Sequence, residues 1–126
     1  MIKIVIEGDV IPAARTRFSG RRCYQPKRNV EYRRLIQSEA RQAMKGAAPL
    51  EGEICADVKI FRKYQRTARI FGDCDNHLKA IFDGLSGIVF SDDAQIVRCV
   101  VEKHTDKESP RAVIEVGEIC AEANKS

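Results

Sequence analysis

Five acidic residues and one lysine gather in the segment 72–97, and their types suit metal-assisted chemistry. Asp73 and Asp75 stand where a loop enters a predicted helix, and Asp92 and Asp93 stand directly before a predicted strand. Carboxylates at a helix N-terminus are held ionised by the helix dipole and by free backbone N–H groups. Ionised carboxylates in an oxygen-rich cluster suit Mg²⁺ or Mn²⁺, which also take waters and phosphate oxygens as ligands. The segment therefore favours cation binding over proton transfer.

Lys79 lies four residues after Asp75, on the side of the predicted helix opposite its apolar stripe. A lysine beside bound metal can neutralise the charge that develops on a cleaved phosphodiester. A purely structural interpretation also fits the residues. Asp73 would then cap the helix, Asp75 and Lys79 would form an i,i+4 pair worth ~0.2–0.5 kcal/mol, and Asp92–Asp93 would be turn residues.

The distribution of charge favours the chemical interpretation. Residues 1–72 hold 16 basic and 7 acidic residues, whereas residues 73–126 hold 6 basic and 11 acidic residues, for a total of +4. Within 15–28 there are six basic residues and no acid, with Phe18 and Tyr24 between them. A basic half of a chain predicts a polyanion partner, and it would bring phosphates to the acidic segment.

Alternating apolar residues predict strands over 2–7, 53–62, 95–102 and 111–118. The last two are most simply the arms of a hairpin joined by the long loop KHTDKESP. A long loop is expected from Pro12 to Arg28.

Apolar residues at helical spacing predict two helices. One covers about 30–46 after an N-cap at Asn29, and the other begins near Asp73–Asp75 and ends at Gly84 and Gly87. The order βαβαββ indicates an α+β fold with a mixed four-stranded sheet packed with two helices, as one domain over 1–120.

The remaining composition fits an intracellular protein. Five scattered cysteines without a C-x-x-C pair argue against a zinc ribbon or a disulfide framework, and most are expected to be small buried residues. There is no apolar run of ~18–20 residues and no signal peptide, so we expect a cytoplasmic protein. Residues 121–126 are expected to form a flexible tail.

The central motif resembles the signature of RusA-type Holliday junction resolvases. The pattern D-x-D-N-x-x-K-x-x-x-D-x-L stands here as Asp73 to Leu85, and D-D-A-Q-I follows as Asp92 to Ile96. The N-terminal half is similar too, with a first strand, a proline at position 12, a basic loop and a helix that contains Glu31-Tyr32-Arg33. One departure is Gly72, which stands where family members are often basic.

This resemblance implies a homodimeric, Mg²⁺-dependent endodeoxyribonuclease (Mn²⁺ also fits) that resolves branched, four-way DNA junctions by paired incisions in recombination and repair. It implies catalytic roles for Asp73, Asp75, Lys79 and Asp93, with Asp92 as a further acid at the metal. The expected DNA contacts are basic residues of the two loops: Arg15, Arg17, Arg21, Arg22, Lys27, Arg28, Arg66 and Arg69.

Other interpretations stay open at this point. Phosphatase or glycosyltransferase chemistry on a D-x-D pair usually needs that pair at the end of a buried strand, and residues 66–72 are basic and polar. A non-catalytic DNA-binding module explains the basic loop but not the acids. His77 and His104 are expected on the surface, and Phe18 and Tyr24 either stack on unpaired bases or pin their loop to the core.

Overall fold

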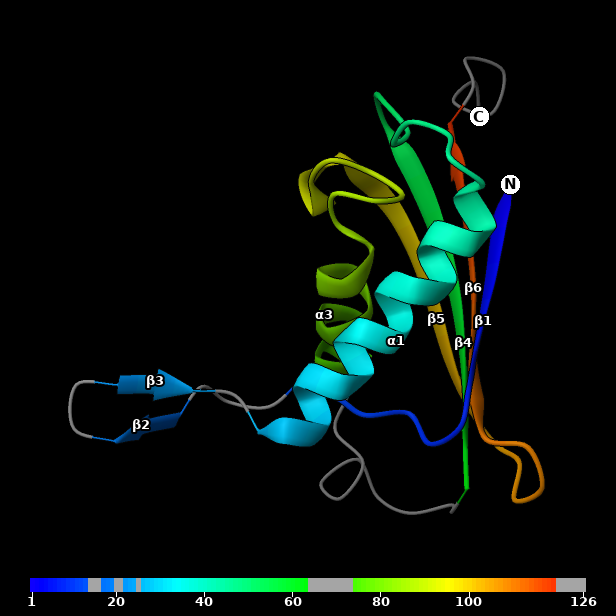
Figure 1. Ribbon diagram of the computed structural model, residues 1–126. Coiled ribbons are helices and arrows are strands. Elements are labelled where there is room, and N and C mark those ends of the chain that lie inside the picture. Colours follow the sequence, from blue (N-terminus) through cyan, green and yellow to red (C-terminus); the bar gives the residue numbers. More distant parts are fainter. Residues whose placement is uncertain (14–16, 20–21, 25, 64–73, 120–126) are drawn as a thin grey trace.

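A computed structural model describes residues 1–13, 17–19, 22–24, 26–63 and 74–119 of the chain (Figure 1). In chain order its elements are β1 (Ile2–Glu7), β2 (Arg17–Ser19), β3 (Arg22–Tyr24), α1 (Lys27–Met44), β4 (Ile54–Arg62), α3 (Cys74–Leu85), the 3₁₀ helix η1 (Asp93–Gln95), β5 (Ile96–Thr105) and β6 (Arg111–Glu118). The predicted tail at 121–126 lies outside the described residues.

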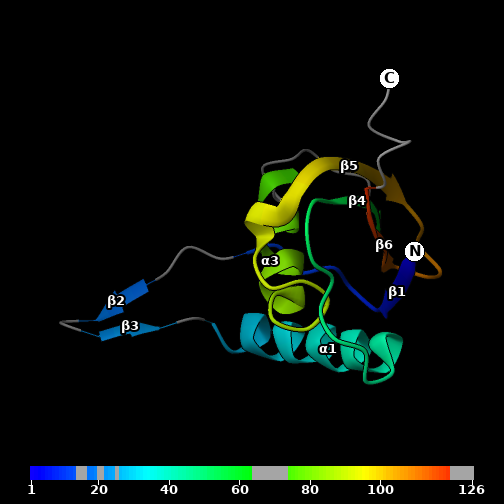
Figure 2. The same cartoon turned by 90° about the horizontal axis from the view of Figure 1, so that it is seen from above.

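The main sheet has the strand order β1-β6-β4-β5. β4 runs parallel to β5 and antiparallel to β6, and β1 is antiparallel to β6, so the sheet is mixed. Both helices lie on one face of this sheet, and the other face carries no helix in the described part of the chain (Figure 2). The predicted α+β class, with a mixed four-stranded sheet and two helices, is confirmed.

The predicted hairpin between the last two strands is wrong, because β4 lies between β5 and β6. β6 buries Ala112, Ile114 and Val116, so it takes an interior position, whereas β5 is exposed along most of its length and takes the edge. The connection between them passes the end of β4, where the Asp106 N–H donates to the Arg62 carbonyl at 2.8 Å. β5 also extends to Thr105, into the segment expected to be loop.

Alternate residues of three strands form the core on the helix-covered face. Ile54, Ala56, Val58 and Ile60 of β4 are all buried, as their spacing predicts. They pack with residues of β1, β6, the two helices and the turn after α3, among them Ile4, Ile6, Ile36, Ile81, Leu85, Val89 and Phe90. Burial of apolar surface on one face of the sheet is what holds the two layers together.

α1 begins at Lys27, three residues before its expected start, and Asn29 is not its N-cap. The side chain of Asn29 instead donates a hydrogen bond to the Pro12 carbonyl at 2.8 Å. The helix ends at Lys45, which adopts the left-handed conformation with φ of 52°, followed by Gly46 with φ of 82°. Its buried stripe is Tyr32, Ile36, Ala40 and Met44.

Gly84 lies inside α3 and lets the two helices approach closely. A Cβ atom at this position would lie 2.6 Å from Cγ2 of Ile36 on α1, which is too close for two carbon atoms. Gly84 therefore serves helix packing, whereas the sequence suggested that it ends the helix. Gly87, with φ of +84°, is the glycine of the following turn.

The expected long loop between Pro12 and Arg28 contains a small second sheet. β2 and β3 form an antiparallel hairpin in which Phe18 opposes Cys23, and the hairpin extends away from the main body (Figure 1). Lys27 and Arg28 belong to α1 and not to the loop.

The described residues also bear on the cysteines and on membrane-spanning helices. Cys99 is exposed and Cys55 is half-buried, so the prediction that the cysteines are buried is wrong for these two. No helix in the described ranges is long and apolar enough to cross a membrane.

Candidate functional site

The outward face of α3 carries Asp75, Lys79 and Asp83 at intervals of four residues, and all three are exposed. Ile81 and Leu85, which turn toward the core, are fully buried. Residues four apart in a helix lie above one another on one face. The motif thus forms an acid–lysine–acid row that points away from the sheet.

Lys79 forms its ion pair with Asp83, not with Asp75 as the structural interpretation of the sequence suggested. The Nζ–Oδ2 distance is 3.9 Å, and the two side chains are 68% and 47% exposed. An exposed i,i+4 pair of this kind contributes only ~0.3–0.5 kcal/mol. Breaking this ion pair costs little free energy, so the Lys79 amine is available to a phosphate.

The Asp92–Asp93 pair lies in a turn that its own side chains build. Asp92 is the N-cap of η1, and its Oδ1 accepts a hydrogen bond from the Ala94 N–H at 3.0 Å. Gln95 completes a reciprocal capping box, because its Oε1 accepts from the Asp92 N–H at 3.0 Å. Asp92 therefore caps this turn, as the structural interpretation suggested, while both acids of the pair are exposed.

Gln95 also fixes where this turn lies in the fold. Its Nε2 donates to the carbonyls of Leu50 and Gly52, both at 3.0 Å. Gln95 is a positioning residue that sequence reasoning missed, although an acid followed three residues later by Gln is the signal of a capping box.

Asp93 has excess negative charge around it. A shared side-chain hydrogen bond with Asp92 raises the pKa of Asp93, and slight burial and the charges of Asp92 and Asp83 raise it further. The positive charge of Lys79 acts in the opposite direction and lowers this pKa. Asp93 therefore lies within electrostatic reach of Asp83 and Lys79 on α3. The pKa of Asp92 is lowered, mainly by its hydrogen bond from Ala94.

The donor chemistry of this region fits a hard divalent cation, since its ligands would be exposed carboxylate oxygens. Asp93, whose pKa is raised by neighbouring acids, would also gain from a cation that offsets this repulsion. No three His, Cys, Asp or Glu residues of the described ranges lie close enough together to hold a metal. Asp73, the remaining predicted ligand, lies outside those ranges.

Comparison with protein families agrees with the motif. The model of the family "Endodeoxyribonuclease RusA" matches residues 7–117, most of the 126-residue chain. The chain belongs to the RusA family. Membership supports an endodeoxyribonuclease, a hydrolase with the role of a Holliday junction resolvase. No curated protein matches the sequence.

His77 of this RusA-family chain is buried, with 1% of its surface exposed, so its predicted surface position is wrong. It lies four residues before Ile81, on the core side of α3. It is therefore held inside the fold, away from the outward row of Asp75, Lys79 and Asp83.

In this RusA-family chain, the segment that leads to the β2–β3 hairpin starts beside α3. The Ala13 N–H donates to the carbonyl of Asn76, in the first turn of α3, at 3.0 Å. The neighbouring Pro12 is tied to α1 through Asn29. The segment that leads to the β2–β3 hairpin is therefore anchored between the N-terminal ends of both helices.

The predicted DNA contacts are described to different extents. Lys27 and Arg28 are exposed on the first turn of α1. Arg17 and Arg22 lie in the strands β2 and β3. Arg15, Arg21, Arg66 and Arg69 lie outside the described residues.

A basic row along α1 was missed by sequence reasoning. Lys27, Arg34, Arg41 and the C-cap residue Lys45 are all exposed and fall on the side of the helix opposite the buried stripe. Their spacing of seven, seven and four residues is the signal, because such intervals keep side chains on one helical face. This row is called the α1 basic row below. The helices that carry it and the acid–lysine row, α1 and α3, lie on the same face of the sheet (Figure 2).

Proposed function

We propose that this chain is a Mg²⁺-dependent endodeoxyribonuclease that resolves four-way DNA junctions by paired symmetric incisions, as a homodimer, in recombination and repair. The observation that carries the proposal is the RusA family match together with the outward row of acids and lysine on α3. The charge around Asp93 and the basic surfaces on the same side of the molecule add support.

The proposed metal ligands are Asp73, Asp75 and Asp93, with Asp92 as an additional acid. A bound divalent cation would polarise the scissile phosphate and supply charge neutralisation for hydrolysis. Asp93 would meet the cation with its exposed carboxylate, while Asp92 keeps the turn in place through its cap. Gln95 would hold this turn at a fixed position relative to residues 50–52.

Lys79 has the proposed role of stabilising negative charge on the phosphate in the transition state. Its amine is on the outward face of α3, is mostly exposed, and within the described residues forms one long ion pair, with Asp83. Asp83 would keep the lysine side chain extended over the acids until DNA replaces this contact. The gain from such a cation is largest when charge develops during the reaction.

DNA binding is assigned to the basic surfaces around this row. The β2–β3 hairpin, the N-terminal turn of α1 and the α1 basic row all belong to the helix-bearing side of the molecule (Figures 1 and 2). Lysine and arginine contacts to phosphates supply affinity that does not depend on sequence. A substrate with several duplex arms gives such a surface more than one arm to contact.

The homodimer follows from the reaction that we propose. One acidic site cuts one strand, and resolving a four-way junction needs two incisions related by its approximate two-fold axis. Two identical subunits about a matching axis supply that geometry, and two-fold dimers are the commonest oligomers. Joining two basic surfaces also raises affinity for a branched substrate through effective concentration.

The test compares a labelled four-way junction with a linear duplex, with Mg²⁺ and with a chelator. We expect symmetric nicks in the junction that need Mg²⁺, while the duplex stays uncut. Asp75→Asn should abolish cleavage and preserve binding, because ionised ligands are needed for hydrolysis whereas affinity comes mainly from Lys and Arg. Asp57→Asn, on the helix-free face of β4, is the matched control and should cut normally.

Each result has one meaning. Junction binding without cleavage by the wild-type chain at any Mg²⁺ or Mn²⁺ concentration would identify a non-catalytic junction-binding protein. Equal cleavage by wild type and Asp75→Asn would show that the site is assigned wrongly.

The α1 basic row has its own test. Arg34→Ala and Arg41→Ala should each weaken junction binding and flatten the slope of log affinity against log salt by ~0.9. Lys59→Ala, an exposed lysine on the helix-free face of the sheet, is the control and should change neither quantity. Equal effects of all three substitutions would remove the row from the DNA-binding surface.

A further inference from the structure

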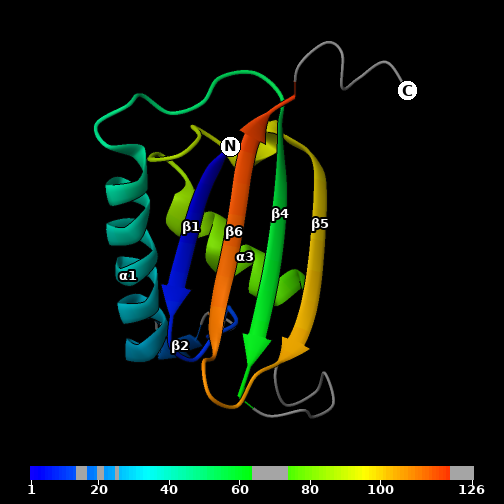
Figure 3. The same ribbon diagram turned by 90° about the vertical axis from the view of Figure 1, so that its right-hand side faces the viewer.

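The outer edge of β5 is a long, exposed strand edge with apolar side chains. β5 is ten residues long and ends the strand order β1-β6-β4-β5, and no described residue pairs with its outer side. Val97 and Val100 are 52% and 40% exposed. The opposite edge differs, because α1 lies alongside β1 (Figure 3).

An edge of this kind is unusual for a protein that remains a monomer. Its unpaired N–H and C=O groups are a template for pairing with another strand, and apolar side chains make that pairing favourable. The charges of β5 then decide which partner fits. Arg98 and Glu102 point to the same face of the sheet, because they oppose Cys55 and Lys59 at alternate positions of β4. Arg98 makes no ion pair within the described part of the chain.

We propose that β5 pairs antiparallel with β5 of a second copy of this chain, about a two-fold axis through Val100. In that register Arg98 of each subunit opposes Glu102 of the partner subunit, so two unlike-charge pairs form across the axis. Opposite charges directly across an antiparallel pair are favourable. The two exposed Val100 side chains meet at the axis itself.

Neighbouring registers lack this complementarity. An axis through Cys99 sets Arg98 opposite Val100, and an axis through Val101 sets Arg98 opposite His104. An axis through Arg98 or Glu102 brings like charges together, which is destabilising. β5 is therefore self-complementary in charge around Val100, which is the property expected of an isologous contact.

The pairing has a consequence for DNA binding, and in this respect it rests on the proposed function. A two-fold axis perpendicular to the sheet joins two four-stranded sheets into one continuous sheet. It also leaves both helix layers on the same side. The two acid–lysine rows, α1 basic rows and β2–β3 hairpins would then all face one side, where a single junction can contact both subunits.

The first experiment is disulfide trapping of the axis. Val100→Cys in a Cys99→Ser background should form a covalent dimer under mild oxidation, because side chains directly opposite have Cβ atoms ~4.5–5.5 Å apart. Val97→Cys in the same background is the matched control. It is as exposed, but it opposes Lys103 of the partner subunit and should not cross-link. Equal cross-linking of both, or of neither, would overturn the register.

The second experiment exchanges the charges. Arg98→Glu or Glu102→Arg alone places two like-charge pairs across the axis and should raise the dimer Kd about tenfold or more by sedimentation. The double variant R98E/E102R should restore the wild-type Kd. Lys107→Glu, the same charge change in an exposed turn, should leave it unaltered. Failure of the double variant to rescue would overturn the pairing.

Failure of this interface and failure of the proposed function give different results. A wild-type dimer that resists Val100→Cys trapping places the contact elsewhere and leaves the proposed nuclease dimer standing. A wild-type monomer at micromolar concentration, free and junction-bound, overturns both the pairing and the dimer. The same monomer cutting single strands in Mg²⁺ would still be a nuclease.

Discussion

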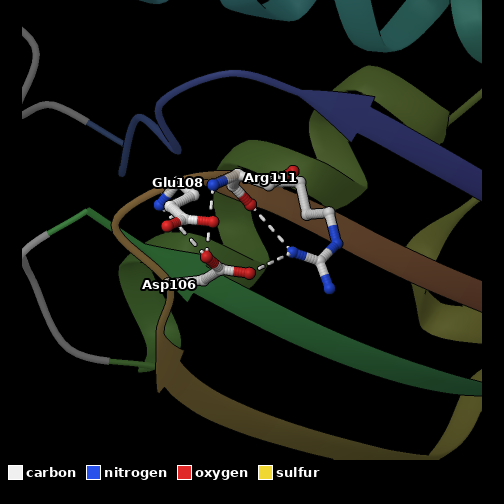
Figure 4. A network of polar contacts seen from close by, with 4 residues as sticks. Asp106, Glu108 and Arg111 are labelled. Atoms are coloured by element: carbon white, nitrogen blue, oxygen red, sulfur yellow. Dashed lines mark hydrogen bonds and ion pairs between the residues drawn. The ribbon is translucent and has the colours of Figure 1, made fainter.

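Two turns that carry aspartates bracket β5, and the charges around these aspartates differ in sign. The turn after β5 holds Asp106, whose carboxylate accepts hydrogen bonds from the N–H groups of Glu108 and Ser109 at 3.1 and 3.2 Å. Arg111 Nη1 donates to its other oxygen at 3.0 Å (Figure 4). These contacts, with the Arg111 bond first, lower the pKa of Asp106.

The partner of Asp106 is itself held in place. Arg111 also donates to the Ser109 carbonyl at 2.8 Å, and its guanidinium lies 3.9 Å from the centre of the Phe61 ring. Phe61 in turn stacks on His104 with 5.1 Å between ring centres. A network of fixed contacts therefore neutralises Asp106, and this turn has a structural role.

Among the described residues, no comparable network neutralises Asp93 in the turn before β5. The groups that act most strongly on it are acids, led by Asp92, and the pKa of Asp93 is raised. Lys79 opposes this, but Lys79 is also paired with Asp83. An acid whose charge is satisfied by fixed partners stabilises the fold, whereas an acid left among other acids is available to a cation from solution.

The largest expected effect comes from exchanging one aspartate of each turn for asparagine. Asp93→Asn should lower junction cleavage in Mg²⁺ on the order of a hundredfold or more, while the folded state loses a repulsion and keeps or gains thermal stability. Asp106→Asn should lower the Tm, because the Arg111 contact loses its charge, and should leave cleavage within about twofold. Both variants are measured by single-turnover cleavage and by thermal melts followed by circular dichroism.

If the two variants exchange these effects, the roles assigned to the two turns are wrong. Loss of cleavage in Asp106→Asn at unchanged junction affinity would place Asp106 in the reaction. A fall in Tm for Asp93→Asn would show that its turn is structural as well.

A second, smaller effect separates the two duties of Asp92. Asp92→Asn keeps a side-chain oxygen that can cap η1 but removes the charge, whereas Asp92→Ala removes both. We expect Asp92→Asn to retain cleavage within about tenfold of wild type and Asp92→Ala to fall below it, because the Asp93 turn then loses its cap. Cleavage assays on both variants check this. If Asp92→Asn is as inactive as Asp93→Asn, the charge of Asp92 is required as a ligand.

Much of the fold could be predicted from periodicity, because burial repeats every two residues in strands and at helical spacing in α3. Strand partners could not be predicted in the same way. Residues 96–101 are as apolar as 112–116, so the pattern alone gives no reason to place β6 inside the sheet and β5 at its edge. That choice depends on which strand the two helices cover.

The candidate site, too, could be predicted only in part. The acids and Lys79 could be named from residue types and the family motif, and α3 places Lys79 and Asp83 on its outward face. The duties of their neighbours depend on contacts distant in sequence. Gln95 binds carbonyls of residues 50–52, and Asn29 binds Pro12 instead of capping α1. His77 was predictable from helical spacing, since it lies one turn before the buried Ile81.

A third prediction concerns pH, because the pKa of Asp93 is raised whereas the pKa of Asp106 is lowered. The pKa of Asp93 is raised, so protons compete with Mg²⁺ more strongly there, and Mg²⁺ affinity should fall as pH drops toward that value, above the ordinary ~3.9. The pKa of Asp106 is lowered, so its stabilisation is present above ~3.9 and is lost only as pH falls through its lower folded value. Mg²⁺ titrations of cleavage and thermal melts over the same pH series measure the two. Parallel decline of both quantities would contradict the assignment.

The smallest expected effect is a change in the pKa of Asp93 when its neighbours on α3 are altered. Lys79→Ala removes the charge that lowers this pKa and should raise it, whereas Asp83→Asn removes a charge that raises it and should lower it. Asp106 belongs to the other turn, and its pKa should not move in either variant. Carboxyl-detected NMR titration of the metal-free chain measures both pKa values in each variant. Shifts of the same sign in both variants would mean that Asp93 responds to a rearranged turn and not to the charges of the acid–lysine row. Opposite signs would show that α3 and the Asp93 turn act as one electrostatic unit, in which the charge of Lys79 offsets part of the negative charge around Asp93.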